Sequence, residues 1–129
     1  MCSSDLGYQK SLRKVAATLN AEWEKTPVRA HAIVEYYSAS DSGFAEMLRQ
    51  KGFSAAQIGT HAGLADTSLA LAVDPSLVRM DQLGAATHGK ADGVYGDPRR
   101  ASAELGKPAL DMIVARTVEA IEASVARRP

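Results

Sequence analysis

The 129-residue sequence contains a single cysteine, Cys2, and aromatic residues make up only 5% of it. One cysteine excludes an internal disulfide framework and a cysteine-based metal site. No uninterrupted apolar run reaches eighteen residues, so the sequence pattern excludes a transmembrane helix. The 15 lysines and arginines balance the 15 aspartates and glutamates, and the formal net charge is zero. Because proteins that bind nucleic acid or membrane surfaces usually carry a basic surplus, we expect neither kind of partner.

The length fits one domain with a moderate hydrophobic core. The first six residues, Met1–Leu6, resemble the translated end of a sequencing adapter, and we expect residues 1–6 to be a non-native leader. Residues 7–129 would then be the protein's own part of a single domain. No targeting signal is recognisable in these residues, so we expect a cytoplasmic protein by default and leave an exported form open.

The most informative stretch, residues 59–68, reads G-T-H-A-G-L-A-D-T-S. The following residues predict a helix over 62–73, because Asp74-Pro75 stops it. His61 then lies beside the helix N-terminus and Asp66 within its first turns. Free N–H groups and a partial positive charge at such an end suit an oxyanion or a metal-bound hydroxide. The alternative interpretation is structural: His61 is a capping or buried core histidine and Asp66 an acid favoured by the helix end, since a metal site normally needs three or four ligands.

The sequence before this stretch predicts a helix, a strand and a second helix. Helical spacing of apolar residues indicates a helix over 7–25, which Pro27 ends. The residues of Val28–Tyr37 favour a strand of a parallel sheet. His31 would face a helix layer, while Tyr36 and Tyr37 would lie at the strand's carboxyl end, where α/β sheets bind ligands. The expected fold class is therefore α/β, built from an αβα unit.

The rest of the chain predicts further helices joined by loops. Residues 40–42 form an N-cap cluster before a helix over 42–50. His88 lies among small polar residues and reads as a loop histidine. Residues 93–98 read as a glycine-punctuated loop or short strand. A last amphipathic helix runs to about Ala126, beginning either at a Ser102 cap or at Pro108.

Three motifs in this order resemble the creatininase family of metal-dependent amidohydrolases. They are G-Y-Q-x-x-L from Gly7, H-A-G-x-x-D-T-S-L-x-L-A from His61 with D-P-x-L-V-R after it, and G-V-x-G-D-P from Gly93 with A-S-x-E-x-G after it. The resemblance implies an αβα sandwich with a parallel sheet, often assembled as a homo-hexamer. It implies a paired site for zinc or manganese and hydrolysis of a non-peptide C–N bond in a small cyclic amide or formamide.

Site residues follow from the same resemblance. His61 would be the catalytic residue that orients substrate or moves a proton to the leaving nitrogen. Asp66 would be a metal ligand, although the family usually has the longer glutamate there. Tyr8 would bind substrate beside the first motif, and Tyr37 is a second substrate-binding candidate from its place at the predicted strand end.

The match covers the C-terminal half of such a protein, because nothing here resembles the family's N-terminal G-S-x-E-Q-H-G motif, which supplies most metal ligands. We therefore expect an incomplete metal site and a fragment that is inactive alone. Creatinine-opening members carry an aromatic residue and an acid where this chain has Gln57 and Ile58, which favours another lactam or a formamide as substrate. The alternative is a non-catalytic α/β module or assembly subunit, in which His61 and Asp66 are structural.

Overall fold

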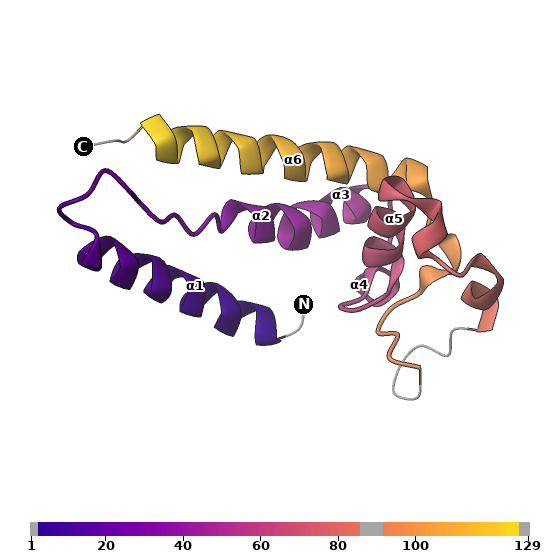
Figure 1. Ribbon diagram of the computed structural model, residues 1–129. Helices are drawn as coiled ribbons and strands as arrows, with labels where there is room; N and C mark the ends of the chain where they lie inside the picture. Colours follow the sequence, from indigo (N-terminus) through magenta and orange to yellow (C-terminus); the bar gives the residue numbers. More distant parts are fainter. Residues whose placement is uncertain (1–2, 86–91, 127–129) are drawn as a thin grey trace.

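The fold is a set of helices with two long members at its edges (Figure 1). The computed structural model describes residues 3–85 and 92–126, and the two long helices are α1 (Ser3–Glu22) and α6 (Ala103–Ala126). The remaining elements are α2 (Glu35–Ser38), the π-helix η1 (Ala39–Gly43), α3 (Phe44–Gln50), α4 (Ala55–Ile58), α5 (Leu64–Val73) and the 3₁₀ helices η2 (Pro75–Leu77), η3 (Met80–Ala85) and η4 (Pro98–Arg100). The described part contains no sheet, so the predicted α/β sandwich with a parallel sheet is wrong for this chain.

The predicted strand Val28–Tyr37 is where the expectation fails. Residues 28–34 run as an unwound segment, and α2 begins at Glu35. Its backbone pairs with a side chain instead of a strand: the Asn20 amide donates to the Ala30 carbonyl (2.9 Å) and accepts from the Ala30 N–H (2.8 Å). Strand propensity reflects packing on a pleated surface beside neighbouring strands, and the described residues provide no such neighbour. His31 is exposed and does not face a helix layer.

Residues 35–50 form one continuous helical stretch made of α2, η1 and α3. The predicted N-cap cluster 40–42 lies inside this stretch, within the π-turn, so the predicted helix start there is wrong. The serines bond backward to the preceding turn: Ser40 Oγ donates to the Tyr37 carbonyl (3.1 Å) and Ser42 Oγ to the Ser38 carbonyl (2.9 Å). Such side-chain bonds to backbone carbonyls accompany distorted helix geometry.

The hydrophobic core lies at one end of the molecule, where α3, α4 and α5 meet the first half of α6. Phe44, Leu48 and Leu64 are fully buried there, and Ala109 of α6 packs among them. α5 and α6 approach so closely at Gly106 that a side chain there would collide with the Ser68 backbone. We call this region, residues 44–73 and 95–113, the packed end.

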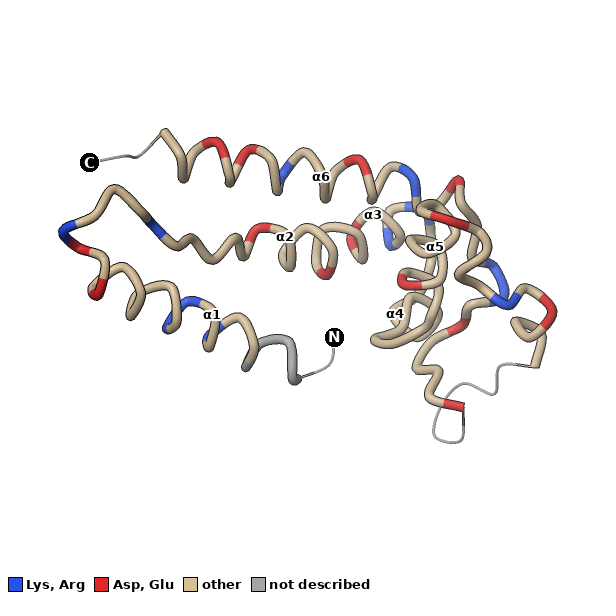
Figure 2. Tube along the Cα trace, in the orientation of Figure 1, with Lys and Arg blue, Asp and Glu red and all other residues tan. Residues whose placement is uncertain are grey.

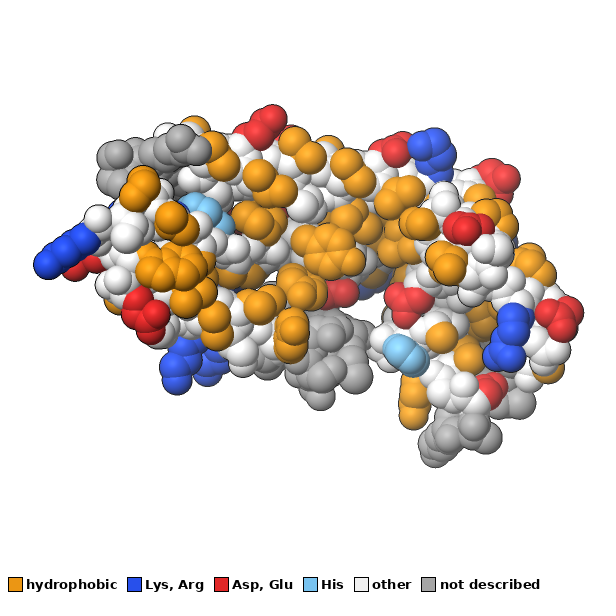
Figure 3. Space-filling model, in the orientation of Figure 1, with side chains coloured by type: hydrophobic (Ala, Val, Ile, Leu, Met, Phe, Trp, Pro, Cys, Tyr) orange, Lys and Arg blue, Asp and Glu red, His pale blue; other side chains and the backbone are white. Residues whose placement is uncertain are grey.

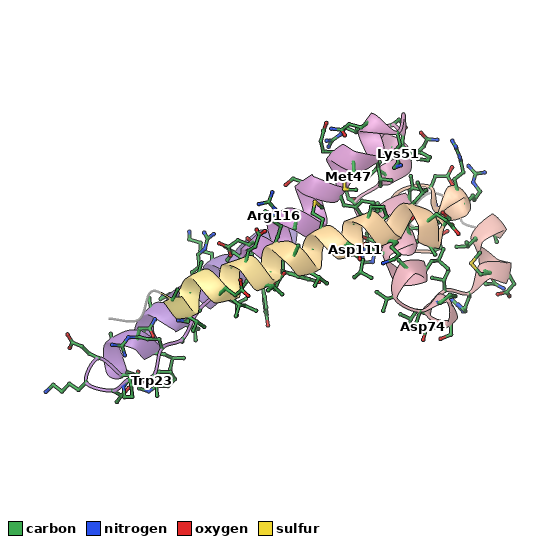
Figure 4. All side chains as sticks on the ribbon, turned by 90° about the horizontal axis from the view of Figure 1, so that it is seen from above. Trp23, Met47, Lys51, Asp74, Asp111 and Arg116 are labelled. Atoms are coloured by element: carbon green, nitrogen blue, oxygen red, sulfur yellow. The ribbon has the colours of Figure 1, made fainter. Side chains whose placement is uncertain are left out.

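The opposite end, which we call the arm, consists of residues 8–34 and 114–126. Figure 4 shows α6 extending from the packed end, near Met47 and Asp74, to the neighbourhood of Trp23. In the arm, apolar side chains of both long helices face solvent, and Figure 3 shows them gathered over α6 and α1 on one face. Despite this apolar surface, no helix in the described ranges is long and apolar enough to span a membrane.

Candidate functional site

Three glycines build the turn that carries His61. Gly59, Gly63 and Gly96 lie where two chain segments cross, and a Cβ on Gly96 would come within 2.7 Å of the Cα atoms of both other glycines. Gly59 also has φ +78° and ψ −178°, a conformation that is essentially restricted to glycine. The motifs G-x-H-A-G and Y-G-D-P are therefore needed together, because each supplies glycine where the other's backbone passes.

His61 is held by its backbone at this crossing. It forms an isolated antiparallel bridge with Tyr95, in which the Tyr95 N–H donates to the His61 carbonyl at 2.8 Å. The Thr60 N–H donates to the Tyr95 carbonyl at 2.7 Å. The backbone is thus fixed on both sides while the His61 side chain remains exposed. The imidazole on this fixed backbone is therefore accessible to a small molecule from solvent.

Three consecutive residues of the motif, Asp66, Thr67 and Ser68, each form a separate hydrogen bond. Asp66 Oδ2 accepts from the Ala62 N–H at 2.8 Å, and Thr67 Oγ1 donates to the Ala62 carbonyl at 3.3 Å. Both stabilise Ala62, which adopts φ +50°, a left-handed conformation that alanine rarely takes. Ser68 is fully buried and its Oγ accepts from the Ser102 N–H, which joins α5 to the start of α6. The sequence motif therefore has a structural explanation at each of its three positions.

A cavity of about 400 Å³ opens beside His61 and Asp66. Its opposite wall comes from η1 and α3 and carries polar groups that the sequence did not single out as functional, Asp41 and Arg49. Arg49 forms an exposed ion pair with Glu46 of the same helix at 2.8 Å. Residues 40–42 read in sequence as a helix cap, whereas in the structure they lie in the π-turn η1 and line this cavity. The volume is suited to a small molecule.

A second cavity of about 430 Å³ lies on the other side of Asp66. Its wall includes Val78 and Arg79 after η2, together with Val94 and Pro98. Asp66 belongs to the walls of both cavities, whereas His61 belongs only to the first. Asp66 is thus the side chain shared between the two cavities, and the predicted catalytic residue His61 borders only the first.

Both Asp-Pro pairs of the motifs act as caps of 3₁₀ turns. Asp74 accepts from the Ser76 N–H at 2.8 Å at the start of η2, and this bond lowers the pKa of the Asp74 carboxyl. Asp97 accepts from the Arg99 N–H at 3.1 Å at the start of η4, and its side-chain hydrogen bonds and charge raise the pKa of the Arg99 guanidinium. These aspartates therefore have local structural roles beside the glycine crossing.

The other predicted site residues lie away from the two cavities. Tyr8 is exposed on α1, and Tyr37 packs edge-on against Tyr36, with ring centroids 5.2 Å apart. Neither tyrosine belongs to the walls of the cavities that contain Asp66, so substrate binding by Tyr8 or Tyr37 stays a prediction. His88 lies outside the described residues.

The described residues do not form a complete metal site. His61 and Asp66 border the same cavity, but no group of three or more metal-binding side chains occurs within residues 3–85 and 92–126. Three or four protein ligands are the norm for zinc. The donor set present therefore does not fit a zinc or manganese centre by itself.

Comparison with known proteins identifies one family. The family described as creatininase, creatinine amidohydrolase, matches residues 1–121. Neither a curated protein nor a solved structure matches the chain. Because the family match extends over nearly the whole chain, from before the first motif to the last turns of α6, the protein belongs to the creatininase family.

Proposed function

We propose that this chain contributes to the hydrolysis of a non-peptide C–N bond in a small cyclic amide or a formamide. Membership of the creatininase family indicates an amidohydrolase-like function. The observation that carries the proposal for this chain is the placement of His61, which is fixed by the glycine crossing at the wall of a 400 Å³ cavity.

The proposed role of His61 is to hold or transfer a proton at the amide nitrogen. An amide nitrogen is a poor leaving group until it is protonated, and a positioned imidazole is the usual side chain for that transfer near neutral pH. The backbone hydrogen bonds between Thr60, His61 and Tyr95 fix the backbone that carries the imidazole at the cavity wall. The polar wall formed by Asp41 and Arg49 would hydrogen-bond the rest of a small, polar substrate.

The metal belongs to the proposal only through the family, which generally depends on a divalent ion such as zinc or manganese. Asp66 is proposed as one ligand. Its Oδ2 accepts from Ala62, and its Oδ1 has no hydrogen bond among the described residues. Because the described residues lack further ligands, the remaining donors would have to come from outside the described ranges. We also propose a homo-oligomer, a hexamer by family resemblance, and a cytoplasmic location.

A non-catalytic module is the second candidate, and one observation favours it. Asp66, Thr67 and Ser68 each have a hydrogen bond that stabilises the turn or the α5–α6 contact, so their presence in the motif does not require chemistry. On this alternative, His61 is an exposed residue of a structural turn.

Hydrolysis assays with His61→Ala test the proposal. Because the chain alone is expected to be inactive, the substitution is made at the matching histidine of a full-length member of the family. That enzyme is supplied with Zn²⁺ or Mn²⁺ and assayed on a panel of five- and six-membered lactams and N-formyl amines by mass spectrometry. We expect turnover to fall by about 10²-fold or more in His61→Ala, the scale typical of a lost acid–base group. His31→Ala, which removes the other exposed histidine of the described part, is the matched control and should keep wild-type turnover.

One outcome would reject a catalytic role for this part of the protein. Equal turnover in the wild type and His61→Ala would remove the histidine from the mechanism and favour the non-catalytic module.

Asp66 is tested separately with two variants. Asp66→Asn keeps an oxygen that can accept from Ala62, whereas Asp66→Ala removes it. If Asp66 binds metal, titration calorimetry with Zn²⁺ should show weaker binding in both variants, with folding stability lowered only in Asp66→Ala. Unchanged Zn²⁺ binding in Asp66→Asn would leave Asp66 with its structural role alone.

A further inference from the structure

The side chain of Tyr95 leaves the backbone beside that of His61. The two residues exchange both hydrogen bonds of the bridge: the Tyr95 N–H donates to the His61 carbonyl at 2.8 Å, and the His61 N–H donates to the Tyr95 carbonyl at 3.4 Å. In an antiparallel pair of this kind the Cα atoms are about 5.5 Å apart, and the two side chains project to the same face. The bridge therefore places a phenol ring next to the imidazole.

Tyr95 also lies directly behind the wall of the first cavity. Gly59, Thr60 and His61 all belong to that wall. The Thr60 N–H donates to the Tyr95 carbonyl at 2.7 Å, and a Cβ on Gly59 would collide with the same oxygen. Tyr95 is not itself a wall residue. Its backbone therefore supports the wall, and its side chain stands at the edge of the cavity on the side of His61.

The Tyr95 ring presents an uncharged flat surface to solvent. The residue is 50% exposed, and its hydroxyl has no hydrogen bond to another described residue. Figure 2 shows segment 93–96 as an uncharged stretch between two acidic positions. No charged side chain of this segment therefore competes with a ligand for the faces of the ring.

The two arginines that follow Tyr95 in the chain are engaged elsewhere. Arg99 donates two hydrogen bonds to the Asp97 carboxylate, each of 2.8 Å. The guanidinium of Arg100 stacks over the Phe53 ring, 4.7 Å from its centroid. Neither guanidinium is therefore placed over Tyr95, and the faces of its ring stay accessible beside His61.

An accessible aromatic ring beside an imidazole suits a flat ligand. The atoms of an amide group are coplanar because of resonance, and a conjugated ring attached to the amide extends that plane. Aromatic side chains bind flat π-systems in an offset-stacked geometry, which a puckered aliphatic group cannot adopt. Because Tyr95 and His61 project side by side, a flat molecule stacked on the Tyr95 ring has one edge at the imidazole.

We infer that Tyr95 is a substrate-positioning residue, which selects amides attached to a flat conjugated group over amides attached to an aliphatic one. The inference rests on the proposed function, because it requires His61 to border the substrate site. It narrows that proposal by the shape of the group next to the C–N bond. The competing role is structural, with the Tyr95 ring serving only as a cross-strand neighbour that stabilises the bridge.

Two formamides of similar size test the inference on the full chain, without any turnover. Formanilide carries a flat phenyl ring on the amide nitrogen, whereas N-cyclohexylformamide carries a puckered saturated ring. Binding is followed by NMR through the His61 imidazole signals, which His61→Ala identifies. We expect formanilide to bind about fivefold more tightly, the scale of one stacking contact. A greasy surface without stacking would instead favour the more apolar cyclohexyl compound.

Three variants separate stacking from the structural role. Tyr95→Leu should reduce the preference to less than about twofold, because the ring is lost while the backbone bonds of the bridge remain. Tyr95→Phe keeps the ring and should keep the preference. Tyr36→Leu removes another half-exposed tyrosine, 47% exposed, and should also keep it. The amide signal of residue 95 verifies that the bridge persists in each variant.

The outcomes distinguish this inference from the proposed function. Equal affinities in the wild type, or a preference that survives in Tyr95→Leu, would overturn the inference and leave His61 at the site. If neither formamide shifts the His61 signals, the proposed site and the inference are both rejected. A nuclear Overhauser effect between the formanilide and Tyr95 rings is expected in the wild type. Its absence would overturn the inference independently of any variant.

Discussion

The packed end and the arm show what apolar residues do with and without partners. At the packed end, Phe44, Leu48 and Leu64 are fully buried, and glycines allow backbone segments to touch. In the arm, helices of equal or greater length expose most of their apolar side chains. Helical spacing of apolar residues is thus present in both regions, but these residues are buried in a core only at the packed end. Spacing predicts a helix and does not predict what the helix packs against.

Truncation of one apolar side chain in each region should give the largest difference in the free energy of unfolding. Phe44→Ala should lower the free energy of unfolding by about 3–5 kcal/mol, because it removes a fully buried ring and leaves a cavity. Val15→Ala, at a half-exposed position of the arm, should change it by less than about 0.5 kcal/mol. Urea denaturation of both variants measures the difference. Similar values would mean that the arm is packed as tightly as the core.

Alanine substitutions at two glycines with positive φ distinguish the cost of backbone strain from the cost of steric crowding. Gly59→Ala should cost roughly 2–4 kcal/mol, because the new Cβ would meet the Tyr95 backbone in addition to an unfavourable φ of +78°. Gly52→Ala has a similar φ of +86° with nothing near its Cβ, and should cost about 1 kcal/mol. Thermal unfolding of the two variants makes the comparison. Equal losses would show that the crossing at the packed end contributes nothing beyond backbone strain.

In the arm, the Asn20 side chain joins α1 to residues 28–34. Asn20→Ala removes both hydrogen bonds to Ala30 and should cost about 1 kcal/mol, seen as faster amide exchange at Ala30. Thr18→Ala removes only an exposed bond to the carbonyl of Lys14 and should leave exchange at Ala30 unchanged. Unaltered exchange in Asn20→Ala would indicate that something else fixes this segment.

The smallest expected effect is a pH dependence at the edge of the packed end. The Ser76 hydrogen bonds lower the pKa of Asp74 in the folded state. Stabilisation from this group is therefore present above the unfolded pKa of about 3.9 and is lost as the pH falls through the lower folded value. An NMR titration of the Asp74 carboxyl should give a pKa below 3.8 in the folded chain. A value at or above 3.8 would contradict the cap. Asp74→Asn keeps an acceptor and should remove this part of the acid sensitivity.

The helices could be predicted because their signals are local. Three helices lie where apolar spacing predicted them. α5 ends before Asp74-Pro75, and α6 begins after Ser102. α1 begins at Ser3 and ends at Glu22, a few residues before Pro27. The Ser102 cap is confirmed, since its Oγ accepts from the Leu105 N–H. The strand over 28–37 could not be judged from its own residues, because a strand requires a neighbour. The same β-branched residues remain unwound when none is available.

The site was predictable in part. Sequence motifs placed His61 and Asp66 together, and both border one cavity. The structural bonds of Asp66 and Ser68 were not predictable, because their partners Ala62 and Ser102 are identified only by the turn and by the α5–α6 contact. Asp41 was missed because residues 40–42 read as a helix cap, and Arg49 because its place in α3 is that of an ordinary exposed helix residue paired with Glu46.

The glycine crossing also has a consequence for folding kinetics. The His61–Tyr95 bridge and the Ser68–Ser102 bond both join residues 34 positions apart, whereas each helix forms from neighbours in the chain. Closing a loop of that length costs conformational entropy before any contact compensates for it. We therefore expect the helices to form first and the loop closure that fixes His61 to come last. The slow step of folding and the completion of the cavity wall would then be one event.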